Sequence, residues 1–168
     1  LNKYPDKVIT LEEADVDWSQ TRAWAWGGYY GRVFLNVKGR DPQGLIEKNQ
    51  FEKERTTLMK KLKNVTDEKG NPLKNIIVTP EHLYKKVNGN PSDIFTMFGD
   101  LSWRTAGSIG HKTLWIFDND TGPDDAVHDW DGIFIMYDPQ HPKSRHVKGM
   151  VLYDVASIIL HAFGIDHL

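Results

Sequence analysis

The sequence predicts an α/β fold in which helices cover a layered sheet. The main observation is that short runs of β-branched and aromatic residues alternate with stretches of helical period, as in layered α/β domains. The length of 168 residues suits one ordinary domain. A content of 39% hydrophobic and 26% charged residues fits a globular protein with one core. We therefore expect residues 1–168 to form a single domain.

The N-terminal part of the chain predicts a loop, a strand and a helix. Residues 1–20 are polar and irregular, which is typical of a loop. The paired glycines Gly27 and Gly28 indicate a turn, and the β-formers of residues 29–37 predict a strand directly after it. In residues 47–63 the apolar side chains recur with a helical period, while Glu, Lys and Arg cover the opposite face.

The remaining elements are shorter, apart from the last helix. In residues 80–84 a helix is expected, because Thr79 suits the N-cap and Pro80 the first helical position. A second helix is expected over residues 153–163, with one apolar face and Gly164 as the C-terminal cap. Runs of β-branched and aromatic residues predict strands over residues 75–79, 93–98, 114–117 and 132–137.

The composition and the absence of certain motifs argue against several functions. The chain has no cysteine, so disulfide and thiolate chemistry are excluded. No run of residues approaches the roughly 20 apolar positions of a membrane span, and the expected location is cytoplasmic without a membrane partner. A net charge of -2 provides no general attraction for polymeric nucleic acid. The nucleophile and phosphate-loop motifs, such as Gly-x-Ser-x-Gly, do not occur.

Acidic residues are concentrated just before the strand expected at residues 132–137. The segment 113–142 contains seven aspartates and no lysine or arginine. Carboxylates held close together repel, so they need a cation, a basic neighbour or water. An EF-hand is excluded, because the sixth and twelfth positions counted from Asp118 are proline and aspartate. Two interpretations stay open, a transition-metal site through His128 or a solvated acidic loop.

Two arginines are candidates for binding an anionic substrate. Arg22 precedes an aromatic stretch, and Arg40 follows the strand expected over residues 29–37. A guanidinium binds phosphate through paired donors, which makes these positions candidates for substrate binding. The alternative is structural, with both arginines supporting their loops or pairing with a carboxylate such as that of Asp41.

Four blocks of sequence, residues 17–24, 34–44, 122–134 and 154–160, occur in a characteristic order. Together they resemble the C-terminal part of type I phosphodiesterase/nucleotide pyrophosphatase-like proteins of the alkaline phosphatase superfamily. The second and third blocks are the most specific, and the third contains Gly-Pro-Asp-Asp-Ala-Val-His-Asp. The fourth departs from the family pattern, since Ser157 stands where the family has proline.

The resemblance implies an alkaline-phosphatase-like core and a site for two divalent metals, commonly zinc. It also implies hydrolysis of a phosphodiester or pyrophosphate bond in a small phosphorylated substrate. His128 matches a late histidine ligand of the family, whereas the nucleophile and an Asp-His-Gly ligand segment have no counterpart in these residues. We therefore expect the chain to be the C-terminal portion of a longer phosphohydrolase and to be inactive alone.

Other functions fit the same residues. A non-catalytic binding or assembly module is one, because the nucleophile is missing and aromatic residues cluster at Trp24, Trp26, Tyr29 and Tyr30. A phosphomutase or sulfatase relative is another, because enzymes of these kinds share the same set of metal ligands.

Overall fold

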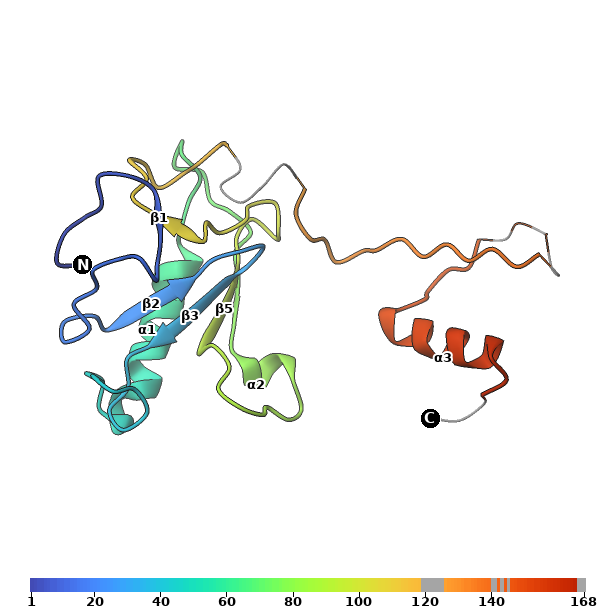
Figure 1. Ribbon diagram of the computed structural model, residues 1–168, viewed down its shortest axis with the longest axis horizontal. Helices are drawn as coiled ribbons and strands as arrows, with labels where there is room; N and C mark the ends of the chain where they lie inside the picture. The colour runs from blue at the N-terminus through green and yellow to red at the C-terminus, as the bar shows by residue number, and fades with distance from the viewer. Residues whose placement is uncertain (119–125, 140–141, 143, 145, 166–168) are drawn as a thin grey trace. The chain divides into compact units, whose positions relative to one another are not determined.

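An antiparallel sheet of four strands organises the first of two units of the chain, residues 1–130 (Figure 1). The computed structural model describes residues 1–118, 126–139, 142, 144 and 146–165. The strand order is β2-β3-β5-β4, from Ala23–Trp26, Gly31–Leu35, Ile94–Met97 and Ile76–Val78. The prediction of a mixed α/β protein is thus confirmed in general terms. All these pairings are antiparallel, because β2 and β3 form a hairpin and β5 runs opposite to both β3 and β4.

The register of the central strands depends on one small residue. Gly31 of β3 lies opposite Thr96 of β5. A Cβ atom at Gly31 would lie 2.2 Å from the Thr96 hydroxyl oxygen, so only glycine fits there. On β2, Trp24 lies opposite Phe34 and their rings stack at 5.4 Å between centroids.

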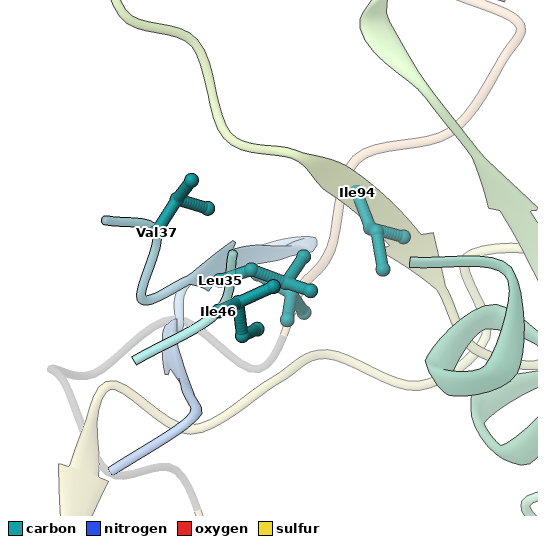
Figure 2. Close-up of a cluster of buried hydrophobic side chains, with 5 residues drawn as sticks. Leu35, Val37, Ile46 and Ile94 are labelled. Atoms are coloured by element: carbon teal, nitrogen blue, oxygen red, sulfur yellow. The ribbon is translucent and has the colours of Figure 1, made fainter. Parts of the chain in front are cut away.

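The core of this unit lies between the sheet and the helix α1, Phe51–Lys63. Figure 2 shows the cluster of buried aliphatic side chains, which come from β3, β5 and the loop after β3: Val33, Leu35, Val37, Ile46 and Ile94. The apolar face of α1 packs against this cluster through Phe51, Leu58, Met59 and Leu62. The face predicted from helical periodicity is therefore the one that is covered. Complete burial of one aliphatic side chain of the cluster contributes about 1.5–3 kcal/mol.

Smaller elements complete the first unit. A 3-10 turn, η1 (Lys48–Gln50), leads into α1, and α2 (Pro80–Leu83) follows β4 directly. The strands β1 (Ile9–Thr10) and β6 (Ser108–Ile109) pair with each other in a second sheet. The prediction of a strand over residues 114–117 is wrong. These residues form no hydrogen-bonded strand pair, and the side chains of Leu114 and Phe117 are exposed.

The second unit, residues 131–168, contains the helix α3, Leu152–Ala162, close to the bounds predicted for it. Residues 132–137 form an extended segment rather than a paired strand (Figure 1). The sequence shows their β-forming character, but a strand also needs a neighbour, and the described residues provide none. That residues 1–168 form a single domain stays a prediction. In the described ranges no helix has the length and apolar character needed to cross a bilayer.

Candidate functional site around His128

Two segments of the first unit are joined through their backbones beside Tyr29. The turn between β2 and β3 meets the segment after β5 where Gly28 and Thr105 exchange backbone hydrogen bonds of 2.8 and 3.0 Å. This close approach requires glycine, because a Cβ atom on Gly27 would lie 1.8 Å from the carbonyl oxygen of Ala106. The side chains of Tyr29 and Arg104 are thereby brought together.

A left-handed turn connects β5 to this segment. Gly99, Asp100 and Leu101 have φ angles of 61°, 56° and 69°. The left-handed conformation costs about 1–2 kcal/mol for a residue other than glycine, so Asp100 and Leu101 are strained. The burial of Leu101 helps to offset this cost. The turn places the Asp100 carboxylate where it accepts a hydrogen bond of 2.8 Å from the indole nitrogen of Trp130.

His128 lies two residues before that anchored tryptophan. Its exposed ring contacts Tyr29, with 4.0 Å between the ring centroids and 57° between the planes. The Arg104 guanidinium carbon lies 5.0 Å from the same Tyr29 centroid. The imidazole and the guanidinium, which makes a cation–π contact with Tyr29, are therefore at most about 9 Å apart. The ring of Tyr29 thus contacts both the imidazole of His128, a candidate metal ligand, and the guanidinium of Arg104.

The side chains near His128 do not form a complete metal site. Among the residues that the structure describes, no group of three His, Cys, Asp or Glu side chains is placed to hold a metal ion. Residues 119–125, which contain three of the seven aspartates of segment 113–142, lie outside the described residues. One imidazole does not satisfy the three or four protein ligands of a zinc site. His128 as a metal ligand stays a prediction.

The two arginines proposed from the sequence as substrate ligands both have carboxylate partners. Arg22 donates to Glu54 of α1 at 2.8 Å. Arg40 donates to both carboxylate oxygens of Asp93, at 2.6 and 2.8 Å, to Asp41 at 3.1 Å and to the carbonyl oxygen of Leu35. The hydrogen bonds and charge of Asp93 raise the pKa of Arg40 above its ordinary value. These contacts favour the structural alternative for Arg40.

Substrate binding by Arg22 or Arg40 stays a prediction, and the described contacts join neither of them to His128. The arginine that shares the ring of Tyr29 with His128 is instead Arg104. No local pattern in the sequence shows that Arg104 meets Tyr29. An arginine next to an aromatic residue is too common a signal to reveal such a contact.

The aromatic cluster predicted as a possible partner surface is divided by the fold. Trp24 packs between Trp18 and Phe34, at centroid distances of 5.2 and 5.4 Å. Trp26 and Tyr30 keep exposed rings.

Comparisons with family models, with curated proteins and with solved structures find no match to this chain.

Proposed function

We propose that the chain is the C-terminal portion of a metal-dependent phosphohydrolase acting on phosphodiester or pyrophosphate bonds, with an alkaline-phosphatase-like fold. The supporting observation is the placement of His128 and Arg104 on one ring, that of Tyr29. Imidazole is a common ligand of zinc and related metals. The positive charge of a guanidinium attracts phosphoryl oxygens. A metal ligand and a phosphate-binding group on one platform suit a phosphorylated substrate.

In this proposal His128 is one donor of a divalent metal centre, and the other donors come from a portion of the longer protein outside these 168 residues. Arg104 binds an oxygen of the phosphoryl group. The hydrogen bond between Trp130 and Asp100 limits the motion of the segment that carries His128. These three groups form a prearranged surface that holds substrate but lacks a nucleophile.

The first test concerns metal binding by the 168-residue chain. Because the proposal places the other metal ligands outside these 168 residues, we expect zinc to bind weakly or not at all in titration calorimetry. A control titration of His128→Ala should give the same heat. Tight binding of zinc at a fixed stoichiometry, lost in the variant, would show that the chain contains a complete site and would contradict the proposal.

The second test concerns catalysis by a hydrolase in which this chain is joined to a portion bearing a nucleophile and further metal ligands. His128→Ala should lower phosphodiesterase activity at least as much as loss of an outer-shell partner does, about 10–100-fold. The matched control is His82→Ala. His82 lies on α2, and its ring is hydrogen-bonded to the hydroxyl group of Thr79 at 2.9 Å. Full activity in His128→Ala would remove this histidine from the site.

A further inference from the structure

The second unit contains an uncharged, extended segment whose large side chains face solvent. Ile133, Ile135 and Tyr137, which share one face of an extended chain, are exposed by 93%, 86% and 81%. Phe134 and Met136 occupy the opposite face and are also exposed. A continuous apolar run of this kind is typical of a strand whose two faces are both covered. Within the described residues no strand pairs with it.

An unpaired apolar strand presents free backbone donors and acceptors and so provides a template for pairing with another chain. We propose that residues 133–137 pair with the same residues of a second copy of this chain, antiparallel and centred on Ile135. Antiparallel self-pairing makes the two strands equivalent, as in a two-fold symmetric dimer. This proposal does not depend on the proposed function.

The charges that flank the segment favour this register. Pairing centred on Ile135 places Ile133 opposite Tyr137, a favourable aliphatic–aromatic pair. Asp138 then lies opposite Gly132, and Asp131 opposite Pro139, so no two carboxylates face each other. Parallel pairing in register would instead place each aspartate opposite its own copy, where like charges repel. Pro139 has no backbone N–H and ends the ladder.

The exposed apolar surface of the unit is large enough for a dimer. Three aromatic side chains of the unit are exposed by 79–89%. They belong to Tyr137 and to Tyr153 and Phe163 at the two ends of α3. An aromatic side chain buries about 150–250 Å² when covered, so these three expose on the order of 400 Å². Ile133, Ile135 and Leu152 add further apolar surface. The total approaches the roughly 800 Å² per partner of a standard interface.

Cysteine cross-linking tests the register, because the chain has no cysteine of its own and each variant then carries a single thiol. Directly opposed residues in an antiparallel pair have Cα atoms about 4.5–5.5 Å apart, within the range of a disulfide. Under mild oxidation with copper phenanthroline, Ile135→Cys should form disulfide-linked dimers. Ile133→Cys and Tyr137→Cys should each stay largely monomeric alone and should cross-link when mixed.

Sedimentation velocity over a range of protein concentrations tests the association itself. The wild-type chain should show a concentration-dependent dimer, and Ile135→Lys should abolish it, because two lysines would meet at the centre of the pair. Val147→Lys is the matched control, since it makes the same charge change at an exposed aliphatic position of the same unit and should still dimerise. Circular dichroism would verify that both variants fold.

Three results would overturn the proposal. One is a wild-type chain that is monomeric at every concentration. A second is equal cross-linking at positions 133, 135 and 137, which indicates parallel or unspecific contact. The third is protection of the amides at residues 133–137 from hydrogen exchange that does not change with protein concentration, because the segment would then be covered by its own chain.

Discussion

Replacing Asp93 with alanine will lower the free energy of unfolding of the first unit by about 3 kcal/mol, the low end of the range for breaking a buried ion pair. Asp93 is only 6% exposed. One carboxylate oxygen accepts from Arg40 at 2.6 Å, and the other accepts from Arg40 at 2.8 Å and from the backbone N–H of Leu35 at 2.7 Å. Alanine leaves both the guanidinium and a core-strand amide without this acceptor.

The low end applies because the Arg40 side chain is 36% exposed, so water partly screens its charge after the partner is lost. Urea denaturation followed by tryptophan fluorescence measures the change, since all six tryptophans lie within residues 1–130. Asp6→Ala is the control, because its pair with Lys3 is fully on the surface and the change should stay within about 0.5 kcal/mol. Equal stability of the two variants would show that the Asp93 ion pair is energetically neutral.

Asn75→Ala should destabilise the same unit by a similar amount, about 3 kcal/mol, because it leaves several buried polar groups without partners at about 1–3 kcal/mol each. The Asn75 side chain is completely buried. Its amide nitrogen lies 2.7 Å from the Val65 carbonyl oxygen and 3.2 Å from that of Lys63, the last residue of α1. Carbonyls at the end of a helix have no partner within the helix and depend on such donors.

The same asparagine reaches the candidate site. Its carbonyl oxygen accepts a hydrogen bond of 3.1 Å from the N–H of Gly99, the first residue of the left-handed turn that contains Asp100. We therefore expect Asn75→Ala to shift both the urea midpoint and the NMR signal of the Trp130 indole N–H. This N–H donates its hydrogen bond to Asp100. Asn88→Ala, at an exposed loop position, should change neither. An unchanged indole signal in a destabilised Asn75→Ala chain would separate the turn from the helix end.

Local sequence was sufficient for those elements whose pattern is short-ranged. The helical period of residues 47–63 predicted α1 and its buried face, and β-branched runs predicted β3, β4 and β5. Propensity was misleading at residues 114–117, where apolar residues stay exposed and unpaired. Propensity also gave no strand for β2, whose Ala-Trp-Ala-Trp run precedes the paired glycines.

The candidate site shows the same division. The aspartates around His128 marked that histidine from the sequence alone, because charge density is visible in a short stretch of residues. Its neighbours Tyr29 and Arg104 belong to segments far away in the chain. The charge of Arg40 makes it a candidate for phosphate binding, yet the carboxylate of Asp93, directly before β5, pairs with it. Periodicity and charge are properties of neighbouring residues, whereas ring contacts and ion pairs arise only when backbone hydrogen bonds and core packing bring distant segments together.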